Sequence, residues 1–172
     1  MIATRRSVGQ LIFLIASIVG MAIAVYLILV HYDQQNVPLV CSTRGFIDCE
    51  NVLNSSYSVV PGTAIPISLP GLLWFLIAAV MAFYGLRSRS SVQWLLLSEV
   101  VWCVLGMLTA FYLVYVELVR LHTLCAWCTA LHVLILTLFI TSIFQLQRAG
   151  ADDEWEEEEV EATLPPVSSK RR

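Results

Sequence analysis

The sequence predicts an all-α membrane protein: a bundle of four transmembrane helices with an outer loop that carries a short interfacial helix. Three observations predict this class. Of the 172 residues, 58% are hydrophobic and 13% are charged, whereas soluble domains have about 45–50% and about 25%. The mean hydropathy is +0.77. Four apolar runs are each long enough, at about 20 residues, to cross a bilayer. A soluble globule, a disordered chain and a disulfide-stapled mini-protein are therefore excluded.

The four expected spans are, in order, residues 8–30, 67–86, 93–119 and 124–144. The first run is too long and too uniformly apolar for a signal peptide, and no small-residue cleavage site follows it. We therefore expect it to remain as a signal-anchor. Residues 1–148 are expected to form one membrane domain.

The outer loop, residues 31–66, contains one expected helix. Asp48 is a suitable N-cap for a helix of two turns over residues 49–56. Val52 and Leu53 would give this helix an apolar face, which favours a position in the membrane interface. The proline-rich stretch 61–70 predicts an irregular entry into the second span.

The distribution of basic residues predicts the orientation. One side of the membrane would hold the N-terminus, the 87–92 turn and the C-terminal tail, with Arg5, Arg6, Arg87, Arg89, Arg148, Lys170, Arg171 and Arg172. The other side would hold only Arg44 and Arg120. Because basic residues favour the cytoplasmic side, both termini are expected in the cytoplasm of a plasma (inner) membrane protein, with the loop outside.

The net charge of −3 comes from the tail. Eight of the thirteen acids lie in residues 152–161, while residues 1–150 carry seven bases and five acids. The segment 149–172 lacks apolar periodicity and is expected to be a disordered, acidic cytoplasmic tail. No basic stripe with interleaved aromatic residues is present, which argues against nucleic-acid binding.

Two acids fall inside the third span, Glu99 and Glu117. Acids within a membrane are functional candidates by default. Both lie near span ends, where we expect them to reach interfacial water. Glu117 is also three residues before Arg120, a helical pairing distance.

Four of the five cysteines are expected on the outer side, where disulfides persist. Cys41 and Cys49 lie in the loop, and Cys125 and Cys128 form a Cys-x-x-Cys motif at the start of the fourth span. A helix N-terminus stabilises the reactive thiolate, and two neighbouring dithiols can exchange a disulfide. Cys103, inside the third span, is expected to be a packed small hydrophobe.

Two other interpretations of the four cysteines remain open. A metal site is disfavoured because the loop pair has seven intervening residues, unlike the two to four of zinc sites. Purely structural disulfides are disfavoured because a bridge between Cys125 and Cys128 would enclose only two residues. The sequence contains no G-x-G-x-x-G motif for a flavin or nicotinamide, so a lipid-soluble quinone is the expected electron acceptor.

The cysteine pattern and its neighbours resemble the vitamin K epoxide reductase family, including its bacterial disulfide-forming members. The matching segments occur in the family's order and are residues 41–49, 51–57, 66–71 and 124–129. The resemblance covers about residues 8–146. Many bacterial members carry a fused thioredoxin-like domain, which is not found in this sequence. A separate thioredoxin-like extracytoplasmic partner is therefore expected to supply the substrate dithiol.

The resemblance implies a role for each matching residue. Cys41 resembles the cysteine that exchanges with the partner, and Cys49 resembles the second shuttle cysteine. Cys125 resembles the cysteine attacked in the transfer, and Cys128 resembles the one that faces the quinone. Ser55 matches a serine that supports the loop or the quinone, although a polar residue ending the helix would look the same.

Two positions depart from the animal-type members of this family. His132 replaces a tyrosine one helical turn beyond Cys128 and could contact a quinone oxygen or form an interhelical hydrogen bond. Ile67, Ser68 and Leu69 stand where an asparagine is expected. These departures favour a quinone-dependent protein-dithiol oxidoreductase using ubiquinone or menaquinone. The alternatives are a vitamin K epoxide or quinone reductase and, with less support, a non-enzymatic membrane protein.

Overall fold

The computed structural model describes residues 2–33, 35–41, 45–87 and 92–163. The long helices are α1 (Ile2–Tyr32), α3 (Ser68–Arg87), α4 (Val92–Tyr115) and α5 (Ala126–Thr163). Helix α2 (Cys49–Leu53) lies in the loop between α1 and α3, and a π-helix, η1 (Val116–Leu121), continues α4. Arg44, Arg89, Lys170, Arg171 and Arg172, used above for orientation, lie outside the described residues, as do the side chains of Arg5 and Arg6.

Within the described residues, four segments are long and apolar enough to span a membrane: Val8–Tyr32, Ser68–Arg87, Gln93–Leu121 and Ala126–Ala151. Apolar side chains point outward along all of them, including Leu73, Leu108 and Phe144. Exposed apolar surface of this extent is stable only in contact with lipid. The protein is therefore an all-α, multi-pass membrane protein, as predicted.

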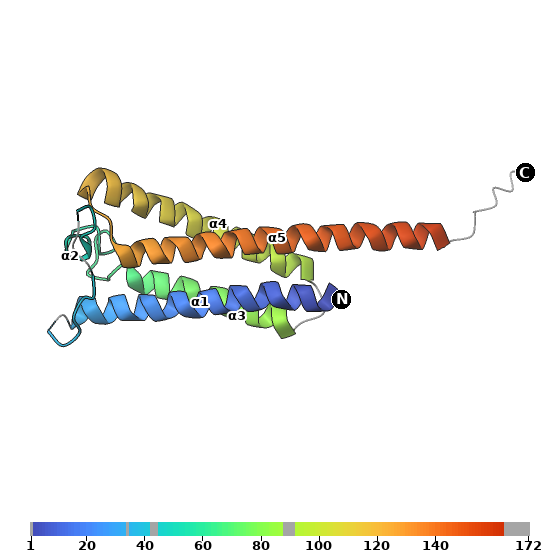
Figure 1. Ribbon diagram of the computed structural model, residues 1–172, viewed down its shortest axis with the longest axis horizontal. Helices are drawn as coiled ribbons and strands as arrows, with labels where there is room; N and C mark the ends of the chain where they lie inside the picture. The colour runs from blue at the N-terminus through green and yellow to red at the C-terminus, as the bar shows by residue number, and fades with distance from the viewer. Residues whose placement is uncertain (1, 34, 42–44, 88–91, 164–172) are drawn as a thin grey trace, which may run out of the picture.

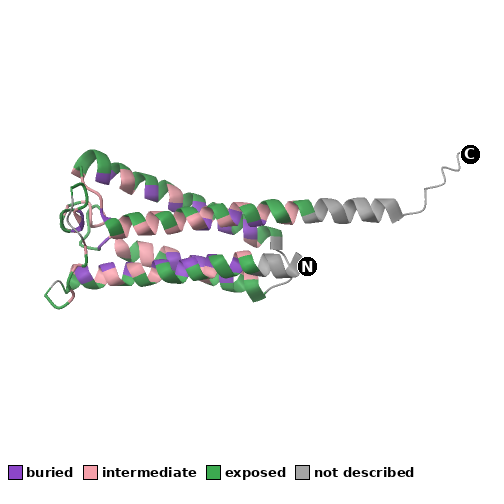
Figure 2. Cartoon of the chain, viewed as in Figure 1, coloured by how far each residue is buried: buried purple, intermediate pink, exposed green. Residues whose placement is uncertain are grey.

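The helices run side by side, and α2 lies at the end opposite the N-terminus (Figure 1). Helix α1 packs mainly on α3, and α4 packs mainly on α5, while contacts between α1 and α5 join the two pairs. Buried side chains follow the facing sides of the helices (Figure 2). Their core includes Phe13, Phe75, Cys103 and Leu138, so Cys103 is a packed core residue, as expected.

Close helix crossings depend on glycines that face aromatic rings. A Cβ atom at Gly20 of α1 would overlap the Phe75 ring of α3, and one at Gly106 of α4 would overlap the Trp74 ring. The indole of Trp102 on α4 stacks on that of Trp74, with ring centroids 6.1 Å apart. Small residues of this kind are typical of helix packing in membranes.

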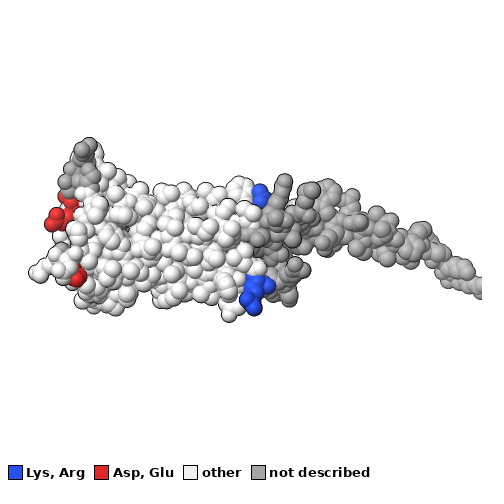
Figure 3. All heavy atoms as spheres, turned by 60° about the horizontal axis from the view of Figure 1, so that its bottom comes forward, with Lys and Arg blue, Asp and Glu red and all other residues white. Residues whose placement is uncertain are grey.

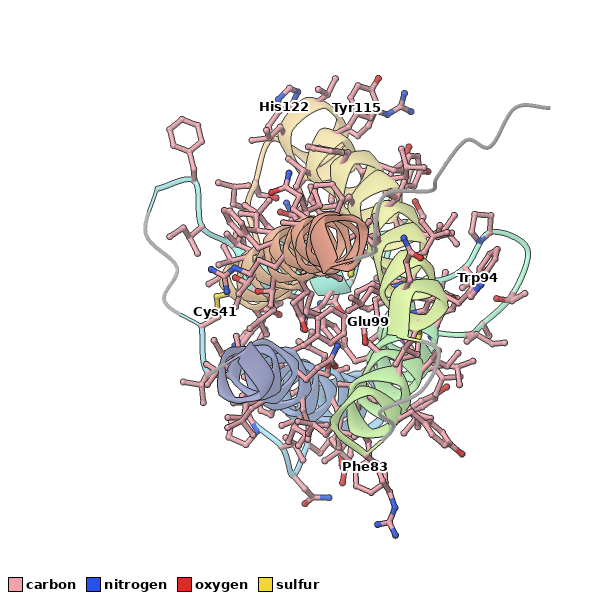
Figure 4. The ribbon with its side chains drawn as sticks, turned by 90° about the vertical axis from the view of Figure 1, so that its right-hand side faces the viewer. Cys41, Phe83, Trp94, Glu99, Tyr115 and His122 are labelled. Atoms are coloured by element: carbon pink, nitrogen blue, oxygen red, sulfur yellow. A yellow bond between two sulfur atoms is a disulfide. The ribbon has the colours of Figure 1, made fainter. Side chains whose placement is uncertain are left out.

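The expected position of Glu99 near interfacial water is wrong. Glu99 is fully buried, and the amide of Gln10 on α1 donates hydrogen bonds of 3.1 Å to both of its carboxylate oxygens. In Figure 4, Glu99 points into the space between the helices, whereas Phe83 and Trp94 point outward. Glu99 lies on the face of α4 that turns toward the other helices. Its position along the span does not by itself reveal which face it occupies.

The C-terminal segment also differs from expectation. Helix α5 continues to Thr163, so residues 149–163 are helical rather than disordered. The lack of apolar periodicity argues against packing of this segment on the bundle, but it does not argue against helix formation. The segment is rich in alanine and glutamate, which are strong helix formers, and the first proline comes at Pro165. Residues 164–172 of the expected tail lie outside the described residues.

Candidate functional site

The Cys-x-x-Cys motif lies at the start of α5. Cys125 precedes the helix and is fully buried, while Cys128 belongs to its first turn. The backbone N–H of Cys128 donates to the Cys125 sulfur at 3.4 Å. A hydrogen bond from the Cys128 thiol, aided by this N–H, lowers the pKa of Cys125 against the opposing effects of burial and of the Glu117 charge. Cys125 is therefore more acidic than an ordinary cysteine, which favours its reactivity.

The two loop cysteines form a disulfide between Cys41 and Cys49, whose Cα atoms are 6.1 Å apart. Cys49 is the first residue of α2 and is fully buried, whereas Cys41 is half-buried. The side chain of Asp48 accepts a hydrogen bond of 3.1 Å from the Asn51 backbone, so Asp48 is the predicted N-cap. The helix itself ends at Leu53, earlier than expected, because turns at Ser55 and Ser58 replace further helical bonds.

A short backbone bridge joins the loop to the start of α5. The N–H of Leu124 donates to Phe46 at 2.7 Å, and the N–H of Asp48 donates to Leu124 at 3.1 Å. Cys49 and Cys125 directly follow Asp48 and Leu124. The bridge therefore brings these cysteines into one buried cluster with Val52, against which Cys41 and Cys128 also pack.

Trp127, between the two cysteines of the motif, holds the segment before Cys41. Its indole N–H donates to the Val40 carbonyl at 2.8 Å, and its ring packs on Tyr26 with centroids 4.9 Å apart. The Tyr26 hydroxyl accepts from the Val40 N–H at 2.9 Å and donates to the Pro38 carbonyl at 3.1 Å. Sequence reasoning missed this clamp because no local pattern links Tyr26, Val40 and Trp127.

A largely apolar cavity lies beside the dithiol. Leu27, Val52, Ile67 and Leu113 are among its lining residues, and Ser55, Glu117 and Cys128 contribute polar groups and a sulfur. Apolar cavities with a few convergent polar groups are typical of cofactor sites. This apolar lining suits a quinone ring in chemical character, and Cys128 is one of the residues of the wall.

The other two residues predicted to bind the quinone differ in position. Ser55 lines the cavity, and its hydroxyl donates to the Val52 carbonyl at 2.7 Å, so it also ends the short helix. His132 is half-buried on α5 and is not among the described residues that line the cavity. Its quinone contact stays a prediction.

Glu117 is placed differently from expectation. It is 4% exposed, so it does not reach interfacial water, and its carboxylate accepts from the Cys125 N–H at 3.5 Å. The guanidinium of Arg120 lies 5.8 Å from the centre of the Tyr57 ring rather than pairing with Glu117. The predicted pairing assumed α-helical spacing, whereas Val116–Leu121 is a π-helix, in which residues three apart no longer align.

One family model matches the chain over residues 11–143, and its description is "Vitamin K epoxide reductase family". The matched range contains all four outer cysteines, the cavity and Glu117. No curated protein matches the chain with significance.

Proposed function

The chain belongs to the vitamin K epoxide reductase family, which marks it as a membrane thiol oxidoreductase linked to quinone, and on this premise we propose a specific relay. A thioredoxin-like extracytoplasmic protein gives up two electrons to the Cys41–Cys49 disulfide. Cys125 and Cys128 receive these electrons through Cys49, and the quinone pool of the membrane is the final acceptor. The partner leaves with a disulfide that it can pass to secreted proteins.

The observation that carries this proposal is the bridge between the loop and α5. It buries the disulfide-bonded Cys49 and the free Cys125 in one cluster. Structural disulfides would need no free dithiol beside them. Thiol–disulfide exchange, in contrast, requires a thiol next to a disulfide, and the lowered pKa of Cys125 favours the reactive form of that thiol.

The first exchange takes place at the surface. Cys41 is half-buried and lines a shallow groove of the loop together with Val37, Leu39 and Asn54. A partner thiolate attacks Cys41 Sγ and releases Cys49 as a thiolate. The second partner thiol then resolves the mixed disulfide, so that the partner is oxidised and Cys41 and Cys49 are reduced.

The second exchange takes place in the buried cluster. Cys49 attacks Cys125 of the oxidised Cys125–Cys128 pair and releases Cys128. Cys41 then attacks Cys49, which restores the outer disulfide and leaves Cys125 and Cys128 reduced. This product has the pairing seen in the structure, with the outer pair bonded and the inner pair free.

The cavity is the proposed quinone site. A bound ubiquinone or menaquinone supplies the electron sink, since it takes up two electrons and two protons. Cys128 forms the redox-active wall, and Ser55 holds the loop against the cavity. His132, further along α5, is proposed to contact a quinone oxygen.

The proposed orientation follows the charge distribution. Basic side chains gather toward one end of the bundle, and acidic side chains lie at the end that carries the loop (Figure 3). Arg87 and Arg148 lie at the end opposite the loop. Because basic residues are enriched on the cytoplasmic side of a membrane, this end is proposed to face the cytoplasm. We place both termini and the helical 149–163 extension of the 1–148 membrane domain in the cytoplasm, with the cysteines outside the plasma membrane.

Reduced thioredoxin and menadione test the relay with the full-length protein in lipid nanodiscs. We expect one menadione to be reduced for each thioredoxin disulfide formed. Cys41→Ala is expected to stop this reaction while dithiothreitol, a small reductant, still supports it. No menadione reduction by the wild-type protein with either reductant would refute the proposed function.

A further inference from the structure

Glu117 lies on an unusual turn of backbone beside the inner cysteines. It belongs to the π-helix Val116–Leu121, which ends at His122 in the left-handed conformation with φ of 53°. The Glu117 carbonyl accepts from the Thr123 N–H at 3.1 Å. π-Helical turns are rare and are found frequently at functional sites. Glu117 is buried within this turn.

The carboxylate of Glu117 meets both members of the dithiol. Oε2 accepts from the Cys125 N–H at 3.5 Å, and the carboxyl also interacts with the Cys128 thiol. Glu117 and Cys128 line the same cavity. One carboxylate therefore links the reacting sulfur to the space in which the electron acceptor is proposed to bind.

A structural salt bridge does not explain this acid. Arg120 lies over Tyr57, and no Lys or Arg lines the cavity among the described residues. An acid buried within a membrane protein is costly unless it has a function or a partner. Here its neighbours are the backbone N–H of Cys125 and the thiol of Cys128.

We propose that Glu117 is the proton acceptor for the Cys125–Cys128 dithiol and that it passes these protons into the cavity. This inference rests on the proposed function, because it assigns the protons of the same reaction. As the disulfide forms, the two thiols lose two electrons and two protons, which a quinone bound in the cavity would take up to become quinol. Glu117 takes the Cys128 proton, releases it to the cavity, and then takes the Cys125 proton in the same way. It ends as the carboxylate from which it began.

The other groups around Glu117 are less suited to this role. His31 of α1 and Tyr57 of the loop also line the cavity, but neither has a hydrogen bond to the motif among the described contacts. Arg120 is the nearby base on the same π-helix, and the Cys49 sulfur of α2 is held in the disulfide. Glu117 alone among them contacts both Cys125 and Cys128.

Two measurements on Glu117→Gln in nanodiscs test the proposal. The first is the pH profile of Cys125 alkylation, read by mass spectrometry without quinone. The Glu117 charge raises the pKa of Cys125, so its removal should shift the profile to lower pH. The second is the oxidation of the dithiol by menadione, which should slow by about 100-fold without a proton acceptor. Loss of folding would instead remove the Cys128 interactions that lower the pKa of Cys125 and would shift the profile to higher pH.

The chain offers two matched variants. Glu117→Asp keeps a carboxylate and is expected to retain a rate within about 10-fold of wild type. Glu99→Gln changes the other buried acid of the same span, which does not contact the motif, and should match wild type in both measurements. A Glu117→Gln variant with the wild-type profile and rate would overturn the proposal. If wild-type dithiol is not oxidised by menadione, the proposed function fails, and an unchanged alkylation profile would separately overturn the role of Glu117.

Discussion

The two ends of the bundle each bury a glutamate of the same span, but with different neighbours. At the end opposite the loop, Glu99 is held by the Gln10 amide at a close-packed site, where a Cβ on Gly85 would overlap Gln10. At the loop end, Glu117 lies beside two thiols and a cavity. Burial of an acid is therefore insufficient to indicate chemistry. A reactive neighbour and access for a ligand distinguish the loop end.

Cysteine substitutions give the strongest test of this difference between the two ends of the bundle. Cys125→Ser removes the sulfur that Cys49 attacks in the proposed relay, so menadione reduction should fall by about 1,000-fold or more. Cys103→Ser changes the core cysteine at a distance from the motif and should leave the rate within about 2-fold. Menadione reduction with thioredoxin as donor measures both. Equal losses in the two variants would mean that thiol chemistry is not confined to the loop end.

Acidity should distinguish Cys125 as well. The Cys128 thiol is the main cause of the lowered pKa of Cys125. In a Cys49→Ala background, which prevents disulfide exchange, Cys128→Ala should therefore raise that pKa. Alkylation of Cys125 at pH 7 should slow several-fold because less thiolate is present, with the difference vanishing at high pH. A profile that does not move, or that moves to lower pH, contradicts this origin of the acidity.

The end opposite the loop should respond in stability rather than in activity. Gln10→Leu removes the donor to Glu99 and should lower the free energy of unfolding by about 1–2 kcal/mol. Unfolding in mixed micelles measures this loss, and menadione reduction should stay within about 2-fold of wild type. A large fall in rate with little loss of stability would assign a catalytic role to this end.

The smallest effect is expected from the C-terminal extension. Deletion of residues 150–172 removes the acidic helix end and leaves the matched family region, residues 11–143, intact. Thiol oxidation should be unchanged within about 2-fold, as measured with reduced thioredoxin and menadione. A large loss would show that the extension contributes to the reaction.

The sequence predicts the features that depend on local pattern. Apolar runs of bilayer length predict the four spans, and Asp48 predicts the start of α2, because both effects act within a few residues or along one helix. The family resemblance adds the cysteine roles. The pairing of Cys41 with Cys49 then appears in the structure.

The features that sequence missed depend on backbone register or on distant contacts. In the π-helical turn, Glu117 and Arg120 no longer have the spacing of an α-helical pair. No local residue pattern predicts such a turn. The Trp127 contact with Val40 joins segments 87 residues apart. The burial of Glu99 depends on Gln10, which lies 89 residues away on another helix.

The most direct test of the account is a trap for the transfer between the two cysteine pairs. In Cys128→Ala, the Cys125 thiol has lost its own partner and should attack Cys49 of the outer disulfide, which frees Cys41. Peptide mapping by mass spectrometry of the folded protein should then find a Cys49–Cys125 disulfide and a free Cys41, with Cys103 unchanged as the internal control. An intact Cys41–Cys49 disulfide beside a free Cys125 would contradict the relay.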